Sequence, residues 1–190
     1  MTHNTTSRSK RILAIDRDGT LVGSCRANFE AYSSAISEYG VEVPAVLNQL
    51  IHLGDSWESI CKSEFPDLSE DVLKRIHSRK SEIFQEFFHL LNWNHELVEQ
   101  ARTEKWVCVS NGTINSSKLI LAGKPQLSPI SIIGPSDKLK PKPSPDMYLY
   151  LIESLRISCS NVLVYEDSDI GRVARCIRIL VHTVSRPRVV

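Results

Sequence analysis

The sequence predicts an α/β fold in which a parallel β-sheet carries helices on both faces and an all-helical segment is inserted after the first strand. Short apolar runs with abrupt polar ends recur along the chain, and such runs are typical of strands buried on both faces of a parallel sheet. Segments with helical periodicity lie between the later runs. This alternation of strands and helices predicts a doubly wound sheet.

Five apolar runs are the candidate strands. In chain order they cover residues 12–15, 106–109, 130–133, 162–165 and 179–184. Polar side chains directly follow several of these runs. Because ligands bind at the carboxyl ends of the strands in an open parallel sheet, we expect these polar side chains to form one site.

Three helical segments separate the later candidate strands. They cover residues 115–122, 145–155 and 169–176, and Ser144 is suited to cap the second of them. Each helical segment connects two successive strands, and a crossover helix of this kind is what parallel pairing requires.

A different region follows the first strand. Residues 24–100 show helical patterns and almost no strand signal, including a long amphipathic helix that ends near Leu91. We therefore expect an α/β core made of residues 1–23 and 101–190, with a disordered tail at 1–9. The helical segment 24–100 is expected to interrupt this core.

Composition and charge exclude several classes of protein. Hydrophobic residues make up 42% and charged residues 24% of the chain, and the net charge of +1 gives no signal for nucleic acid or membrane. No apolar run approaches the roughly 20 residues needed to span a bilayer, and no signal-peptide pattern follows the polar start. We expect a cytoplasmic protein that does not bind membranes, while the sequence says nothing about its oligomeric state.

Cysteines, histidines and the basic C-terminal segment give no separate functional signal. The five cysteines are widely spaced without a C-x-x-C pair, and the six histidines show no metal-binding spacing. The last twenty residues carry five arginines and no acidic residue. We interpret these arginines mainly as a solvated helix face, so nucleic acid is not the expected partner, although a nucleic-acid 3′-phosphatase stays open as an alternative.

Four carboxylates are predicted to meet at one edge of the sheet. Asp16 and Asp18 follow the first candidate strand, and Glu166 and Asp167 follow the fourth. Crowded carboxylates repel one another, and a hard divalent cation bound by oxygen ligands relieves this repulsion. The pattern therefore predicts a site for Mg2+.

A lysine and a hydroxyl group are predicted to join these carboxylates. Ser110 and Asn111 follow the second candidate strand, and Lys142 lies just before the helical segment 145–155. Phosphoryl transfer depends mostly on positioning and charge stabilisation. An attacking carboxylate is therefore sufficient for this reaction if a lysine and a serine neutralise and orient the phosphoryl oxygens. The sequence predicts a phosphoryl-transfer enzyme in which one of these carboxylates is the nucleophile.

Four short motifs resemble those of the haloacid dehalogenase-like (HAD) superfamily, and they occur in that family's order. The runs 16–21 (Asp-Arg-Asp-Gly-Thr-Leu), 110–112 (Ser-Asn-Gly), 142–146 (Lys-Pro-Ser-Pro-Asp) and 166–171 (Glu-Asp-Ser-Asp-Ile-Gly) are similar to motifs I to IV. The resemblance covers roughly residues 11–184. It implies a Rossmann-like sheet of five strands in the order 3-2-1-4-5.

The resemblance also implies which residues carry the catalytic chemistry. Asp16 would attack phosphorus and form an aspartyl-phosphate, while Asp18 would protonate the leaving group and later activate water. Lys142 would hold the nucleophile and the phosphate together. The dehalogenases of this family lack an aspartate at the position of Asp18, so its presence favours phosphate esters as substrates.

The binding residues are implied in the same way. The Ser110 hydroxyl would bind a phosphate oxygen, helped by backbone amides near Asn111 and Gly112. Magnesium would be bound by the Asp16 carboxylate, the Asp18 backbone carbonyl and Asp167. Glu166 would either bind the ion directly or contact one of its ligands. The implied metal-site residues are Asp16, Asp18, Glu166 and Asp167.

The helical insert is similar to the C1 cap of this family, which closes over the active site and selects the substrate. The run 54–58 (Gly-Asp-Ser-Trp-Glu) stands where beta-phosphoglucomutase-like members often have Gly-x-Ser-Arg-Glu. Trp57 replaces the arginine that would grip a sugar phosphate. The sequence therefore favours a phosphatase of a small phosphorylated metabolite. A beta-phosphoglucomutase-like phosphomutase and a non-catalytic phosphate-binding relative are the alternatives.

Overall fold

The structure is a computed structural model, and it describes residues 11–167 and 180–183. The predicted tail at 1–9 and the predicted helix at 169–176 lie outside the described residues, as do the C-terminal arginines and the end of motif IV. None of the helices in the described ranges is both long and apolar enough to cross a membrane.

The chain forms two compact units, one made of Met1–Val22 with Trp93–Val190 and the other of Gly23–Asn92. The sequence-based boundaries placed residues 93–100 in the helical insert, whereas the structure groups them with the first unit. Leu97 of that segment packs in a core cluster with the first strand.

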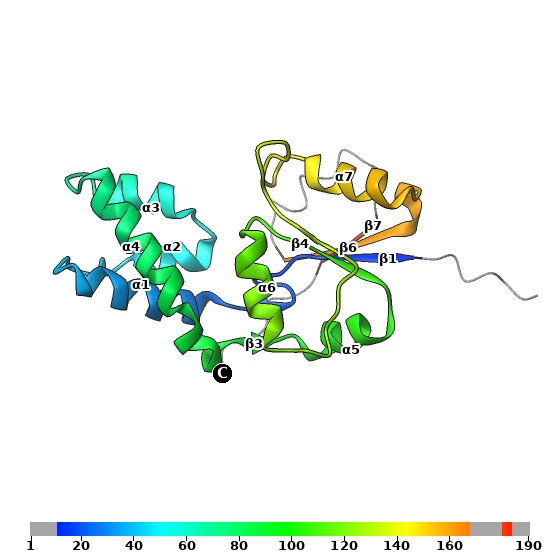
Figure 1. Cartoon of the computed structure of the whole chain (residues 1–190), viewed down its shortest axis with the longest axis horizontal. Helices are drawn as coiled ribbons and strands as arrows, with labels where there is room; N and C mark the ends of the chain where they lie inside the picture. The colour runs from blue at the N-terminus through cyan, green and yellow to red at the C-terminus, as the bar shows by residue number, and fades with distance from the viewer. Residues whose placement is uncertain (1–10, 168–179, 184–190) are drawn as a thin grey trace, which may run out of the picture. The chain divides into compact units, whose positions relative to one another are not determined.

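The first unit is built on a five-stranded sheet (Figure 1). Its strands are β1 (Ile12–Ile15), β4 (Trp106–Val109), β5 (Ile132–Ile133), β6 (Val162–Glu166) and β7 (Leu180–Thr183). They lie in the order β5-β4-β1-β6-β7, and each neighbouring pair is parallel. Numbered along the chain, these strands have the order 3-2-1-4-5, so the predicted fold class is confirmed.

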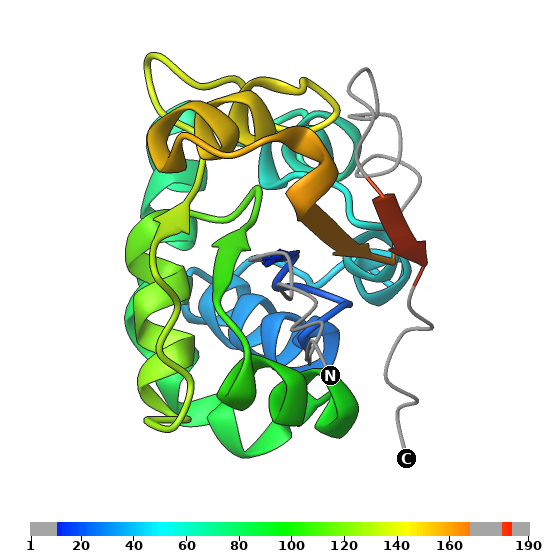
Figure 2. The same cartoon turned by 90° about the vertical axis from the view of Figure 1, so that its right-hand side faces the viewer.

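Helices cover both faces of this sheet, and Figure 1 and Figure 2 show α7 on one side and α5 on the other. Among the described residues, the helices of this unit are α5 (His95–Thr103), α6 (Ile114–Ala122) and α7 (Asp146–Leu155), with a 3-10 helix, η2 (Cys159–Asn161). Alternate residues of β1 face opposite sides. Leu13 packs in the cluster that contains α5 side chains, whereas Ile12 packs in the cluster that contains Met147 of α7. The central strand is therefore buried on both faces, as its apolar run predicts.

Two helices of this unit begin at a side-chain cap. The Asn94 side chain accepts a hydrogen bond from the first turn of α5, and the Thr113 side chain does the same for α6. Helix α7 begins differently, because its N-cap is Pro145 and no side chain caps it. The predicted cap at Ser144 is wrong, because Pro145 occupies the N-cap position. The Ser144 hydroxyl instead donates to the carboxylate of Asp146 at 2.6 Å.

The second unit is helical. Its helices are α1 (Cys25–Glu38), α2 (Leu47–Leu53), α3 (Trp57–Glu64), α4 (Glu70–Ile83) and the 3-10 helix η1 (Phe84–Leu90). The predicted long helix ending near Leu91 is wrong as one α-helix, because α4 ends at Ile83 and η1 continues. The short strands β2 (Val22–Gly23) and β3 (Asn92–Trp93) pair where the chain passes between the units.

Candidate active site

Asp16 lies at the centre of the carboxyl edge of the sheet, because it follows β1 and β1 has β4 and β6 as its neighbours. Its backbone amide donates to the carbonyl of Tyr165 at 3.1 Å, which continues the ladder past the end of the strand. Ser110 follows β4 and Glu166 ends β6, so three of the predicted residues occupy adjacent strand ends. All three side chains are buried.

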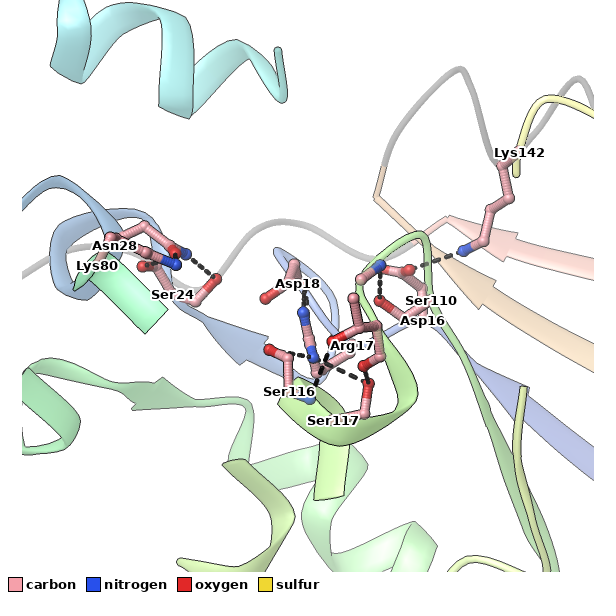
Figure 3. Close-up of polar contacts among 12 residues, drawn as sticks. Asp16, Arg17, Asp18, Ser24, Asn28, Lys80, Ser110, Ser116, Ser117 and Lys142 are labelled. Carbon is pink, nitrogen blue, oxygen red and sulfur yellow. Dashed lines mark hydrogen bonds and ion pairs between the residues drawn. The ribbon is translucent and has the colours of Figure 1, made fainter. Parts of the chain in front are cut away.

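Lys142 joins two of the carboxylates. Its side chain is 3% exposed, and its Nζ donates to Asp16 Oδ1 at 2.7 Å and also to Glu166 Oε1 (Figure 3 shows the bond to Asp16). Two other lysines of the same segment, Lys138 and Lys140, are exposed. The structure therefore places Lys142 beside Asp16, as the resemblance of motif III implies, and it does not place Lys138 or Lys140 there.

The loop that carries Lys142 is held by the side chain of Asn111. The backbone amide of Lys142 donates to Asn111 Oδ1 at 2.7 Å, and Asn111 Nδ2 donates to the Lys142 carbonyl at 3.1 Å. The sequence reading considered only the backbone near Asn111 as a phosphate donor. The side chain has a separate role, which is to fix motif III against motif II.

Tyr148 is a site residue that the sequence reading missed. Its phenol donates to Glu166 Oε1 at 3.0 Å, the same carboxylate oxygen that Lys142 contacts. Tyr148 directly follows Met147 in α7, and both side chains are buried. A buried tyrosine hydroxyl needs a hydrogen-bond partner.

Burial and charge shift the pKa values of these groups. Burial raises the pKa of Asp16 to about 7, with Lys142 opposing and Glu166 adding to the shift. Burial alone would lower the pKa of Lys142, but the negative charges around it raise the pKa overall. Burial also raises the pKa of the Tyr148 phenol, which therefore stays a hydrogen-bond donor. A cation beside Asp16 would favour its ionised form.

Three carboxylates could hold a metal ion together. Asp16, Glu166 and Asp167 each offer an oxygen atom, and these atoms lie within 4.8 Å of one another. The donor set is made of hard oxygen ligands, which suits Mg2+. Thr20 donates its hydroxyl to Asp167 Oδ1 at 3.0 Å, so the carboxylate is oriented from the motif I loop. The residues present therefore fit a magnesium ion.

Gly19 allows this close approach of motif I to motif IV. Its φ of +82° is a conformation that L side chains rarely adopt, and a Cβ there would lie 2.5 Å from Asp167 Oδ2. A glycine is thus required at this position for two reasons. The backbone has a positive φ, and Asp167 occupies the space that a side chain would need.

The motif II loop lies at the start of α6. The buried Ser110 hydroxyl accepts a hydrogen bond from the backbone amide of Gly112 at 3.0 Å. Ser110 and Gly112 are therefore in contact within the motif II loop, and their role in binding phosphate stays a prediction. Chemically, this loop offers a hydroxyl beside the nucleophile strand.

Asp18 lies in a different environment from the other carboxylates. Its side chain is 37% exposed, and it forms an ion pair with Arg17, whose side chain is 6% exposed (Figure 3). The cluster of potential metal ligands described above does not include the Asp18 carboxylate. An exposed carboxylate close to a buried nucleophile can exchange protons with water and with a bound ligand.

Comparison with known proteins assigns the chain to a family. Residues 13–174 match the family described as haloacid dehalogenase-like hydrolase. The chain belongs to this family. The resemblance of the four motifs is therefore confirmed, and the protein is a hydrolase of the HAD superfamily.

Individual HAD proteins resemble the chain over most of its length. A phosphorylated carbohydrates phosphatase from Thermotoga maritima is 26% identical over 165 residues, which cover 82% of this chain and 76% of that protein. A predicted phosphoglycolate phosphatase from Haemophilus somnus 129PT has a TM-score of 0.73 at 17% identity, covering 95% of this chain and 88% of that one. A HAD family hydrolase from Deinococcus radiodurans R1, solved with bound phosphate and sodium, has a TM-score of 0.60 at 22% identity, covering 87% and 76%. The two solved structures share the fold.

Proposed function

We propose that this HAD hydrolase is a magnesium-dependent phosphatase that cleaves a small phosphomonoester through an aspartyl-phosphate on Asp16. One observation carries the proposal. The buried Asp16 carboxylate is held at 2.7 Å by Lys142, while oxygen atoms of Glu166 and Asp167 lie within 4.8 Å of its own. A nucleophile, a cation for the phosphoryl group and a set of metal ligands thus meet at one edge of the sheet.

The first half of the reaction transfers the phosphoryl group to the protein. A carboxylate oxygen of Asp16 forms a bond to phosphorus as the bond from phosphorus to the ester oxygen breaks. The protonated Asp18 carboxyl gives its proton to that ester oxygen, so the product leaves as an alcohol. Lys142 and the Ser110 hydroxyl contact the phosphoryl oxygens, where negative charge develops.

The second half releases inorganic phosphate. Asp18, now ionised, takes a proton from a water molecule whose oxygen bonds to phosphorus, and the bond from phosphorus to Asp16 breaks. Asp16, Asp167 and the backbone carbonyl of Asp18 would hold Mg2+, which supplies positive charge next to the transferring phosphoryl group. Glu166 acts on Lys142 through the ion pair and orients its Nζ.

A small phosphorylated metabolite is the proposed substrate. The name of the Thermotoga maritima relative supports a phosphorylated carbohydrate as one class to test. We propose that the helical unit acts as the cap that selects it, and that the enzyme works in the cytoplasm. Trp57 stacks on Tyr32 with ring centroids 4.6 Å apart, which supports a packing role and weighs against the phosphomutase alternative. Measuring phosphate release against isomer formation from a sugar phosphate separates the two activities.

The Asp16→Asn variant tests the proposed nucleophile. We expect magnesium-dependent hydrolysis of p-nitrophenyl phosphate to be abolished, because an amide cannot form the acyl phosphate, while circular dichroism shows the fold intact. Asp137→Asn, which changes an exposed aspartate of the same unit, is the matched control and should keep full turnover. Wild-type turnover in Asp16→Asn would show that the nucleophile is assigned to the wrong residue.

A further inference from the structure

Arg17 is a buried cation between the two aspartates of motif I. Its Nε donates to Asp18 Oδ2 at 2.9 Å, and its Nη2 contacts the same oxygen. The guanidinium therefore holds one oxygen of the Asp18 carboxylate by two of its nitrogen atoms.

The other side of the guanidinium is anchored to α6. Nη1 donates to the hydroxyl of Ser116 at 3.1 Å and to the hydroxyl of Ser117 at 2.9 Å (Figure 3). The Ser117 hydroxyl in turn donates to the carbonyl of Thr113 at 3.2 Å, which fixes its orientation. The position of Arg17 is thus set by the first turn of a helix that lies far away in the sequence.

Gly112 makes room for this arrangement. A Cβ at Gly112 would collide with the terminal nitrogen atoms of Arg17. The motif II loop therefore closes on the guanidinium, and the glycine that the sequence reading assigned to phosphate binding also serves the packing of Arg17. Space, hydrogen bonds and charge all confine this side chain to one position.

Burying a guanidinium is unfavourable unless a charge partner and hydrogen bonds compensate. Arg17 is 6% exposed, whereas the Asp18 side chain is 37% exposed. The arginine is thus the buried partner of the pair, and the aspartate is the more exposed one. The ion pair therefore links Asp18 to a guanidinium that the serines of α6 hold in place.

We propose that Arg17 is a positioning residue that holds the Asp18 carboxylate against α6 in the orientation needed for proton transfer. The inference rests on the proposed function, because it takes Asp18 as the general acid and base. With Oδ2 bound by the guanidinium, proton transfer to the ester oxygen and from water proceeds through Oδ1. Arg17 itself forms no bond to the substrate.

This role predicts a dependence on the leaving group. A poor leaving group needs the proton of Asp18, whereas p-nitrophenolate leaves with little help. In Arg17→Met we expect kcat for phenyl phosphate to fall about tenfold to hundredfold, since small misplacements of a catalytic group cost up to about 10²-fold. The kcat for p-nitrophenyl phosphate should fall clearly less, and KM for both should stay within about twofold of wild type.

The test compares kcat and KM for aryl phosphates from p-nitrophenyl to p-methylphenyl phosphate in five proteins. These are wild type, Arg17→Met, Arg17→Lys, Asp18→Asn and the double variant Arg17→Met with Asp18→Asn. Arg17→Lys should restore part of the loss, because an ammonium can reach the carboxylate without the two-nitrogen contact. In the Asp18→Asn background, Arg17→Met should add little, since its effect acts through Asp18.

A second variant covers the case in which Arg17→Met does not fold. Ser116→Ala with Ser117→Ala removes the anchor and leaves the ion pair, so it should show the same leaving-group dependence with a smaller loss. Arg102→Met, which removes an exposed arginine of α5 paired with Glu99, is the matched control. Thermal unfolding of every variant reports its folding.

Three results would overturn the inference. One is an equal loss of kcat with every leaving group, one is unchanged kcat, and one is a full additional loss in the Asp18→Asn background. These are distinct from failure of the proposed function, which would appear as a wild type without magnesium-dependent hydrolysis or an active Asp16→Asn. An active wild type, an inactive Asp16→Asn and an unaffected Arg17→Met would reject the role of Arg17 alone.

Discussion

The two aspartates proposed to carry the reaction are held in different ways, although one residue separates them in the sequence. Asp16 is paired with Lys142, whose side chain is 3% exposed and which also bridges to Glu166. Asp18 is paired with Arg17 and is 37% exposed. The proposed nucleophile is therefore enclosed, whereas the proposed acid and base is partly exposed to solvent.

The difference matches what each proposed role requires. A nucleophile gains from a fixed, water-poor position, because the barrier to attack depends on the alignment of the reacting atoms. A general acid that later becomes a general base must exchange its proton with water during every cycle. Each aspartate lies beside one buried cation. Lys142 encloses Asp16, whereas Arg17 orients Asp18 and leaves it accessible to water.

Lys142→Met is the strongest test of the enclosure of Asp16. Without Nζ, Asp16 and Glu166 face each other without their shared cation, and the phosphoryl group loses a charged donor. We expect turnover of p-nitrophenyl phosphate to fall by about 10²- to 10³-fold. Loss of one partner of a buried ion pair should also destabilise the fold by about 3–5 kcal/mol, measured by urea unfolding.

Magnesium distinguishes the two effects of Lys142→Met. Added Mg2+ should recover part of the stability, because a cation between the carboxylates reduces their repulsion, and it should not recover turnover. Lys140→Met is the control, since Lys140 is exposed in the same segment. Equal losses in the two variants would mean that the charge of the segment matters and the contact with Asp16 does not.

Gly19→Ala tests the metal side of the nucleophile. The new Cβ would lie 2.5 Å from Asp167 Oδ2 and would displace this carboxylate from the cluster. We expect the magnesium concentration for half-maximal turnover to rise by about tenfold or more, as changes around metal ligands commonly cause. Titration of activity with magnesium measures this shift, and calorimetric magnesium binding checks it independently of turnover.

Gly40→Ala is the matched control for Gly19→Ala. Gly40 also has a positive φ, +69°, but a Cβ there would meet nothing within 4 Å. Both variants should lose about 1 kcal/mol of stability from the unfavourable backbone conformation, and only Gly19→Ala should weaken magnesium binding. A common shift in both would assign the effect to the backbone and not to the space around Asp167.

The sheet and the strand ends were predictable because both follow from local patterns. Apolar runs such as 106–109 carry the signal of a buried strand, and the motif order then fixes which residue ends each strand. Where the pattern is ambiguous, the prediction failed. The apolar spacing that continues from α4 into η1 cannot show where the α-helix stops, because side chains three apart share a face in both kinds of helix.

The missed parts of the site are contacts between distant side chains. The contacts of Arg17 with Ser116 and Ser117 join positions 99 and 100 residues apart, and no local pattern encodes such a pairing. The side chain of Asn111 reaches the backbone of Lys142 in a similar way across 31 residues. Sequence motifs predicted which side chains react, and the packing of the fold determines what holds these side chains.

Tyr148→Phe is the mildest test of the enclosure of Asp16. Removing the phenol oxygen takes away one donor to Glu166 and leaves Lys142 in place. We expect a loss of stability of about 1–3 kcal/mol, the range for a hydrogen bond to a charged group, measured by urea unfolding. Turnover of p-nitrophenyl phosphate should fall less than about tenfold, because the bond from Lys142 to Asp16 stays.

Tyr150→Phe is the matched control, because Tyr150 lies on the same helix with its side chain about half exposed. It should change neither stability nor turnover measurably. If Tyr148→Phe lowered turnover as far as Lys142→Met, the orientation of Glu166 would control the position of Asp16. Lys142 would then act mainly through its ion pair with Glu166. If turnover stays close to wild type while stability falls, Tyr148 supports the enclosure and Lys142 alone sets the position of Asp16.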